Sequence, residues 1–248
     1  MRNATIFTLF TLGVLVMNYL ANSLPLNGVT TGELSNRYNS LITPAGVAFS
    51  IWGIIYLSLI IWIGRLWYGA IRKEESIVHD SNKLLIWYPL NCTLNVAWLA
   101  AWHYGDVNLS LLIMLGILVS LIMIYKQADH FGKLWRFPFS IYLGWISVAT
   151  IVNFSVVAIH NQWVLFPDEA VNITIVMMVV AAILGLYFIH KKYDIIYALV
   201  IGWALFFISF KQTGIQSIYY TGYGLVLILL INIFYLKLTN LINRKTIN

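Results

Sequence analysis

The sequence predicts an all-α, polytopic integral membrane protein, a helix bundle with about eight transmembrane helices. Hydrophobic residues make up 60% of the 248 positions and charged residues only 10%, whereas about a quarter of the residues in a soluble domain are charged. The apolar residues come in blocks of roughly 20, the helix length that crosses a hydrocarbon layer of about 30 Å. A water-soluble core of this size cannot hide so much apolar surface, and helices satisfy their own backbone hydrogen bonds inside lipid.

The apolar blocks define the expected helices in chain order. A cleaved signal peptide is the alternative for the first block, but no clear small-x-small cleavage site follows it. The expected helix ranges are 4–24, 44–67, 84–104, 107–125, 139–160, 170–190, 194–209 and 217–236.

The basic residues predict how these helices are oriented. With eight spans, both termini and the loops after the second, fourth and sixth helices lie on one side. Of the 15 Lys and Arg residues, all but Arg37 and Lys211 fall on that side. Cytoplasmic loops carry such an excess, so we expect cytoplasmic N and C termini and an external first loop. Anionic lipid headgroups account for the net charge of +6, and no nucleic-acid-binding signature accompanies it.

Reactive side chains are sparse in this sequence. The single Cys92 can form neither a disulfide nor a Cys-based metal site within the chain, and the histidines do not pair at ligand spacing. The sequence has no glycine-rich phosphate loop and no nucleophile beside a base. We therefore predict no catalytic residue and no metal site. His103 and His160, at outward helix ends, are the candidates for ligating a haem iron.

Charged residues are also absent from the middle of every expected helix. Proton relays, ion-coupled transport sites and retinal Schiff bases normally need such a residue within the membrane. Those functions are therefore disfavoured, and the chemistry of the bundle is left to aromatic rings, amides and hydroxyls.

Three of the apolar blocks carry an aromatic stripe along one helical face. In the fifth block, Tyr142, Trp145, Ala149 and Asn153 lie within about 60° of one another at 100° per residue. Ordinary bundle packing is one interpretation, in which amides bond across helices for roughly 0.6–2 kcal/mol and small residues allow close approach. A ligand pocket between the helices is the other. The stripe of the third block is Trp87, Asn91, Asn95, Trp98 and Trp102, and that of the second block is Ala45, Ala48, Phe49, Trp52 and Tyr56.

A family resemblance favours the pocket. YLGWISVATIVNF (residues 142–154) resembles the fifth-helix signature of the TspO/translocator protein family, also called tryptophan-rich sensory proteins, which reads Y-L-x-W-x-x-x-A-T-x-x-N followed by an aromatic residue. LNVAW (94–98) is similar to the family's third-helix L-N-x-x-W, and TPAGVAFSIWGIIY (43–56) to the start of its second helix. The three motifs occur in family order.

The resemblance implies five helices around an apolar pocket, which the first loop caps and which takes porphyrins and other flat hydrophobic ligands. Aromatic rings would face a planar ligand, Ala149 would leave room for it, and Asn153 would bond a neighbouring helix or the polar edge of the ligand. The ligand-binding residues expected on this basis are Trp52, Tyr56, Asn95, Trp98, Tyr142, Trp145, Ala149 and Asn153.

The function implied is that of a TspO-like membrane receptor or sensory protein that binds a tetrapyrrole, either a porphyrin or haem, and requires no cofactor. Family members are linked to light-dependent porphyrin breakdown, and the tryptophans implied in it map onto Trp52 and Trp145. Weak enzymatic activity therefore stays open, although we do not predict an enzyme. A transporter of a hydrophobic or small organic solute is the main alternative, because three further helices could build a path. A structural, partner-binding membrane protein is the third.

The resemblance also predicts the domain organisation. The family typically has five helices, so we expect a TspO-like domain at 1–162 and a three-helix extension at 163–248. Ala45 stands where the family has a second proline, and LAAW (99–102) replaces the prolines after Trp98. We expect a multi-pass protein of the cytoplasmic (plasma) membrane. Membrane lipid and a hydrophobic small molecule are its expected partners, nucleic acid is not, and a homodimer is left open.

Overall fold

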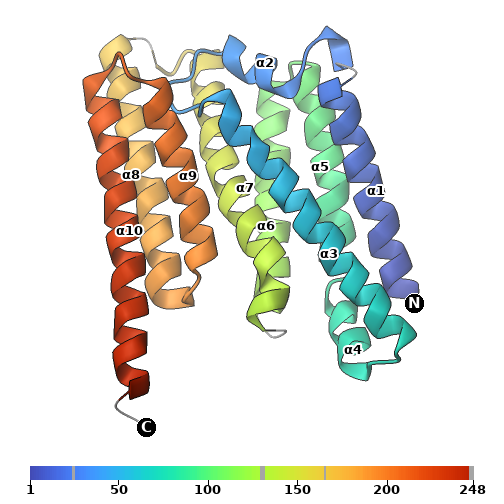
Figure 1. Ribbon diagram of the computed structural model, residues 1–248. Helices are drawn as coiled ribbons and strands as arrows, with labels where there is room; N and C mark the ends of the chain where they lie inside the picture. The colour runs from blue at the N-terminus through green and yellow to red at the C-terminus, as the bar shows by residue number, and fades with distance from the viewer. Residues whose placement is uncertain (24–25, 129–131, 165, 246–248) are drawn as a thin grey trace. The chain divides into compact units, whose positions relative to one another are not determined.

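The computed structural model describes the chain except for residues 24–25, 129–131, 165 and 246–248 (Figure 1). The described residues form helices joined by short turns, and no strand occurs among them. Among the described residues, six helical segments are long and apolar enough to cross a membrane. They are Arg2–Ser23 (α1), Gly46–Ile71 (a 3-10 turn, Gly46–Ser50, followed by α3, Ile51–Ile71), Val107–Ala128 (α6), Trp135–His160 (most of α7, Lys133–His160), Pro167–Lys192 (α8) and Gln216–Thr239 (most of α10, Gln216–Lys245).

Two shorter helices occupy the remaining two of the eight expected ranges, and with the first of them the described residues hold up to seven candidate spans. α5 (Trp87–His103) follows α4 (Glu75–Lys83) after a 50° bend, and this pair qualifies as one further span. α9 (Ile195–Lys211) is a shorter apolar helix of 17 residues. The predicted fold class, a polytopic helical membrane protein, is thereby confirmed.

The helix ends differ from the predicted ones where polar residues continue an apolar helix. α7 begins at Lys133 rather than at residue 139, so Pro138 lies inside it. α10 continues to Lys245 rather than ending at 236. Hydropathy marks the part of a helix that is embedded in lipid, whereas backbone hydrogen bonding carries the helix beyond it into the polar layer.

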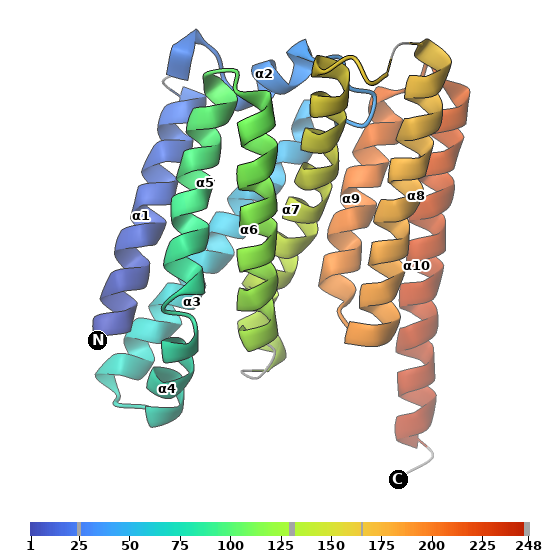
Figure 2. The same ribbon diagram turned by 180° about the vertical axis from the view of Figure 1, so that it is seen from behind.

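The first compact unit comprises Met1–Ser40 and Phe49–Asn161. Its five long helices form a closed ring, in which α1 packs on α5, α5 on α6, α6 on α7, α7 on α3, and α3 on α1 (Figures 1 and 2). α7 is the most enclosed of the membrane-length helices, with 72% of its apolar window buried. The helix that carries the YLGWISVATIVNF motif therefore contacts protein on most of its faces.

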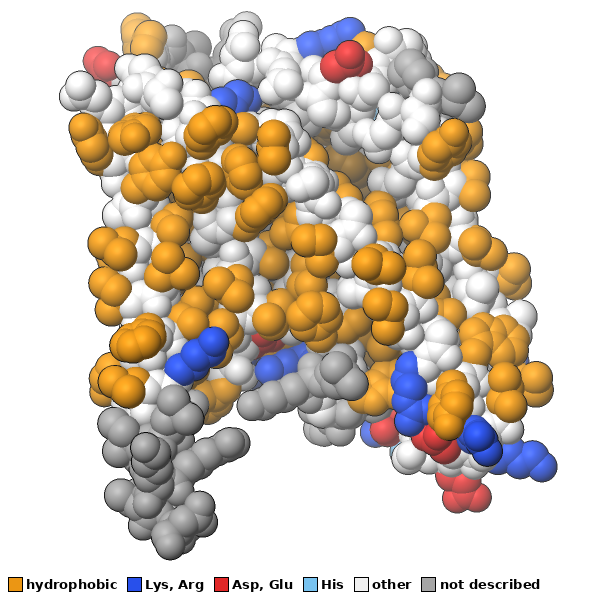
Figure 3. All heavy atoms as spheres, viewed as in Figure 1, with side chains coloured by type: hydrophobic (Ala, Val, Ile, Leu, Met, Phe, Trp, Pro, Cys, Tyr) orange, Lys and Arg blue, Asp and Glu red, His pale blue; other side chains and the backbone are white. Residues whose placement is uncertain are grey.

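Two short helices lie at opposite ends of this ring. α2 (Thr31–Arg37) belongs to the loop between α1 and α3 (Figure 1). It begins with a capping box, in which Thr30 and Glu33 each bond the backbone N–H of the other. α4 follows α3 after a turn at the other end, and charged side chains of both signs gather around it (Figure 3).

The second compact unit contains α8, α9 and α10, each of which packs on the other two, together with the segment Leu41–Ala48. Three hydrogen bonds join that segment to α9 and to Gln212, the residue that follows it. Ala45 N donates to Phe207 O at 3.1 Å, Trp203 Nε1 donates to Ala48 O at 3.0 Å, and Gln212 Nε2 donates to Leu41 O at 2.9 Å. The residues just before α3 thus belong to the C-terminal unit, whereas the division into domains at residue 162 stays a prediction.

Candidate ligand site beneath the loop between α1 and α3

Five aromatic side chains of α3, its preceding turn and α7 form a cluster centred on Trp52. The Trp52 ring stacks on Tyr56 at 5.4 Å between centroids and 21° between planes. It meets Tyr142 edge-on at 5.8 Å and Trp145 edge-on at 6.4 Å. Phe49 and Trp145 also meet edge to face, at 5.7 Å between centroids. We call Phe49, Trp52, Tyr56, Tyr142 and Trp145 the Trp52 cluster.

Helical spacing explains how these rings come together. Trp52 and Tyr56 are one turn apart on α3, and Tyr142 and Trp145 are three residues apart on α7, so each pair lies on one face of its helix. α3 and α7 pack against each other, which brings the two faces together. Tyr142 and Trp145 are only 6% and 3% exposed. Edge-to-face and offset-stacked ring pairs each contribute about 0.5–1.5 kcal/mol beyond the area they bury.

Asn95 connects the cluster to the rest of the ring of helices. Its Nδ2 donates to Tyr142 Oη at 3.1 Å, and its Oδ1 accepts from Asn18 Nδ2 at 3.2 Å. The amide is 3% exposed. One side chain of α5 therefore holds α1 and α7 through a buried polar link, and the Tyr142 hydroxyl is fixed in place.

Trp98 of α5 takes part in a second aromatic group, nearer the loop. Its ring stacks on Trp102 at 5.6 Å with 17° between planes, and Tyr38 from the loop packs on Trp102 at 5.7 Å. Val29 and Leu34 of the loop join Trp102 in an apolar cluster with the start of α6 and the last turns of α7. We call this arrangement of residues 26–40 over α5, α6 and α7 the loop cover.

Hydrogen bonds hold the loop cover down. Asn27 Nδ2 donates to the His103 carbonyl at 3.1 Å, Thr31 Oγ1 lies 3.0 Å from His103 Nε2, and Ser40 Oγ lies 2.9 Å from Ser155 Oγ. His103 is 1% exposed. Because its Nε2 is engaged by the loop, this histidine does not offer that nitrogen to a haem iron.

The capping box at the start of α2 affects one titratable group of the loop cover. The hydrogen bond from the Thr30 backbone N–H, and then the bond with the Thr30 hydroxyl, lowers the pKa of Glu33 below its ordinary value. Both bonds favour the ionised carboxylate. The α2 cap is therefore complete at neutral pH.

Three buried polar atoms near these rings have no hydrogen-bond partner among the described residues: Tyr56 Oη, Trp98 Nε1 and Trp102 Nε1. A buried donor without a partner costs about 1–3 kcal/mol, and most buried polar groups in native proteins are satisfied. All three atoms are donors that a ligand carrying acceptor groups would satisfy.

The sequence matches the family model described as TSPO-like protein over residues 4–235. The chain belongs to this TSPO-like family. The match covers most of the chain, including α8, α9 and much of α10, and it confirms the resemblance carried by the three motifs. Searches of curated proteins and of solved structures gave no match.

The site residues predicted for this TSPO-like protein fall into three places. Trp52, Tyr56, Tyr142 and Trp145 meet in the Trp52 cluster, and Asn95 bonds it. Trp98 stacks on Trp102 instead. Asn153 Oδ1 accepts from Ser110 Oγ at 3.3 Å, which joins α7 to α6. Ala149 lies on α7 between Trp145 and Asn153 and is partly buried. Their role in binding stays a prediction.

Three aromatic residues that pack against the predicted site residues were not in the predicted set. Phe49 and Trp102 lay on the predicted stripes, so their spacing was the signal that could have included them. Tyr38 carries no such signal, because it lies in a polar loop and reaches Trp102 only through the fold of that loop.

Proposed function

We propose that this TSPO-like membrane protein is a receptor or sensory protein that binds a tetrapyrrole, or a similar planar hydrophobic small molecule, between the Trp52 cluster and the loop cover. One observation carries the proposal: three buried donors, Tyr56 Oη, Trp98 Nε1 and Trp102 Nε1, lack a partner among the described residues, in a region otherwise lined by aromatic rings. Apolar sites with a few polar groups are typical of small-molecule binding.

Porphyrin chemistry fits this set of residues. A porphyrin is a flat aromatic macrocycle with carboxylates at its edge. The rings of Trp52 and Trp145 would take the flat face, and the unpartnered N–H and O–H groups would donate to the carboxylates. Because the His103 Nε2 is engaged by Thr31, we favour recognition of the ring and its carboxylates over axial ligation of an iron.

The test compares two tryptophans of α7, Trp145 in the middle of the helix and Trp135 in its first turn. Protoporphyrin should quench the tryptophan emission of the purified protein saturably, with a midpoint on the order of micromolar or tighter, which is about 8 kcal/mol of binding free energy. Loss of an aromatic contact of about 1 kcal/mol means that Trp145→Leu should raise the midpoint about fivefold or more. Trp135→Leu is the control, because Trp135 packs on Trp62 near α4 and should change the midpoint by less than about twofold.

Other outcomes would overturn the proposal. Quenching that never saturates, or equal effects of the two variants, would mean that the stripes serve bundle packing. Flux of the porphyrin across proteoliposomes would favour the transporter alternative, whereas equimolar binding without flux would favour the receptor.

Illumination of the bound porphyrin tests the weak degradative activity. If the pigment is lost at equal rates in Trp52→Phe and in the wild type, this site does not carry that activity. We propose the cytoplasmic membrane as the location, and cell fractionation tests it.

A further inference from the structure

A groove opens on the side of the five-helix unit, where the last turns of α3 meet the first turns of α7. It encloses about 340 Å³. Ile61 and Phe137 at its edges are 64% and 39% exposed, so the groove faces the surroundings of the bundle. Its lining is apolar except for Ser58 and Arg65, and the other lining residues are Trp62, Trp135 and Pro138. An apolar groove on a lipid-facing surface suits a hydrocarbon chain.

A second cavity adjoins this groove on the side of α4. It encloses about 250 Å³, and Trp62, Arg65 and Trp135 line both spaces. The part that the groove does not share has four polar side chains, Glu74, Ser76, Asp80 and Ser81, beside the apolar Leu66, Ile77 and Leu84. We call it the polar cavity. An apolar space and a polar space thus meet at Arg65.

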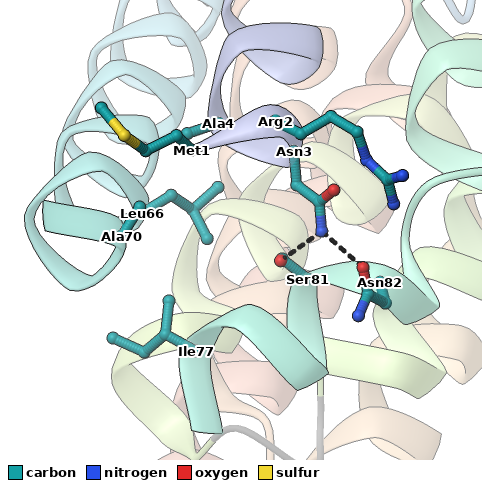
Figure 4. Close-up of a pocket in the computed structure, with 9 residues that line it drawn as sticks. All are labelled: Met1, Arg2, Asn3, Ala4, Leu66, Ala70, Ile77, Ser81 and Asn82. Atoms are coloured by element: carbon teal, nitrogen blue, oxygen red, sulfur yellow. Dashed lines mark hydrogen bonds between the residues drawn. The ribbon is translucent and has the colours of Figure 1, made fainter. Parts of the chain in front are cut away.

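Close packing and hydrogen bonds hold α4 in place as the wall of the polar cavity. Gly69 of α3 approaches α4 so closely that a Cβ built there would lie 2.5 Å from Cδ1 of Ile77. Asn3 Nδ2 of α1 donates to Ser81 Oγ at 2.8 Å and to Asn82 Oδ1 at 2.7 Å, beside a third cavity of about 360 Å³ (Figure 4). The polar cavity is therefore a built feature of the α4 end.

Arg65 carries the charge at the point where the two spaces meet. Its guanidinium bonds Glu74 through both terminal nitrogens, at 3.2 and 2.8 Å, and lies over the Trp135 ring at 5.8 Å. A guanidinium has five N–H groups, so it can keep this contact and donate to a phosphate as well. The pair is 43% and 34% exposed, and exposed ion pairs are weak enough to rearrange at little cost.

The carboxylates of the polar cavity determine which charges a lipid headgroup bound there must carry besides its phosphate. Glu74 and Asp80 line it together with one cation, Arg65, while Lys83 binds Asp80 from outside the lining at 3.2 Å. A phosphate on Arg65 would bring its oxygens close to two acidic side chains. A headgroup with an ammonium beside its phosphate would satisfy both signs. Choline has no N–H to donate, and glycerol has no positive charge.

We propose that these two spaces bind one phospholipid with a primary-amine headgroup, phosphatidylethanolamine. One acyl chain lies in the groove between α3 and α7, the phosphate meets Arg65, and the ammonium meets Glu74 and Asp80. This site lies at the opposite end of the five-helix unit from the loop cover, and it does not depend on the proposed porphyrin function.

Native mass spectrometry of the purified, delipidated protein with equimolar phosphatidylethanolamine, phosphatidylglycerol and phosphatidylcholine is the test. We expect one phosphatidylethanolamine per chain to be retained at least about fivefold over each of the others. Arg65→Gln should lower that retention at least about fivefold. Arg72→Gln is the matched control, because Arg72 lies over the same Tyr68 ring as Arg65 but lines neither space; it should change retention less than about twofold.

Two further measurements separate the headgroup from the chain. Glu74→Gln removes one of the two carboxylates and should shift the preference toward phosphatidylglycerol. Ile61→Trp, at an exposed position, should fill the groove and weaken retention without disturbing the fold, which keeps the test usable should Arg65→Gln fail to fold. Glycerophosphoethanolamine, which has no acyl chains, should not compete.

Several results would overturn the proposal. They are equal retention of the three lipids, a preference of the wild type for phosphatidylglycerol, equal effects of Arg65→Gln and Arg72→Gln, or effective competition by glycerophosphoethanolamine, which would reduce the site to a pocket for a free headgroup.

Discussion

The two ends of the five-helix unit differ in how far they are covered: a folded loop closes one end, whereas cavities stay open at the other. At the end under residues 26–40, loop side chains bond His103 and Ser155, and Tyr38 and Leu34 cover Trp102. At the α4 end, a turn leads straight from α3 into α4, and open spaces remain around Arg65. A covered end suits a ligand that must be enclosed, whereas an open end suits one that stays partly in the lipid.

The largest expected effect concerns which end faces which side of the membrane. Single cysteines at Asn36 on α2 and at Ser76 on α4 should differ completely toward a membrane-impermeant maleimide added to intact cells. The excess of Lys and Arg places α4 in the cytoplasm, so only Asn36→Cys should be labelled. Native Cys92 is buried and should stay unlabelled, so the wild-type protein serves as the negative control. Labelling of Ser76→Cys in intact cells would invert the assignment of the two ends.

A smaller effect is expected from the polar link inside the bundle. Asn95→Leu removes the bonds to Tyr142 and Asn18 and should lower stability in detergent by roughly 0.5–2 kcal/mol, the range for hydrogen bonds between membrane helices. Unfolding in a denaturing detergent measures it. Asn22→Leu is the control, since its side chain is exposed and its amide donates to the Asn18 carbonyl of its own helix. Porphyrin affinity should change less than stability; its loss at unchanged stability would make Asn95 a ligand contact.

The smallest expected effect is confined to the loop cover. Thr30→Ala removes the cap of α2, and its amide hydrogens should exchange about fivefold faster, while those of α1 stay unchanged. Acid should also lower the protection factor of the α2 amides, which is the intrinsic exchange rate at each pH divided by the observed rate. Because the pKa of Glu33 is lowered in the folded protein, its stabilising effect is complete above the ordinary glutamate pKa and is lost as the pH falls through the lowered one. Glu33→Gln should abolish this pH dependence of the protection factor, and Glu75→Gln should not. An α2 protection factor that does not change with pH in the wild type would contradict the prediction.

Periodicity and hydropathy predicted the long helices and the aromatic stripe on each of three of them, because these depend on residues close together in sequence. That Trp52 and Trp145 belong to one site was implied by the family resemblance. The motifs of the second and fifth expected helices carried that resemblance, and the structure packs the corresponding helices, α3 and α7, against each other. Trp98 turned toward Trp102 rather than Trp52, and Asn153 toward Ser110, because the rotation of each helix is set by all its neighbours at once. The loop cover was harder to predict, although the T-x-x-E pattern at Thr30–Glu33 was a local signal for α2.

The grouping of Leu41–Ala48 with the C-terminal unit has a consequence for the order in which the chain is completed. Its partners Trp203 and Gln212 lie 155 and 171 residues further along the sequence. Chains are made from the N-terminus, so this segment, which leads directly into α3, leaves the ribosome long before α9 exists. Its three hydrogen bonds close only when the last helices have been inserted. The approach to α3 is therefore among the first parts of the protein to be synthesised and among the last to be finished.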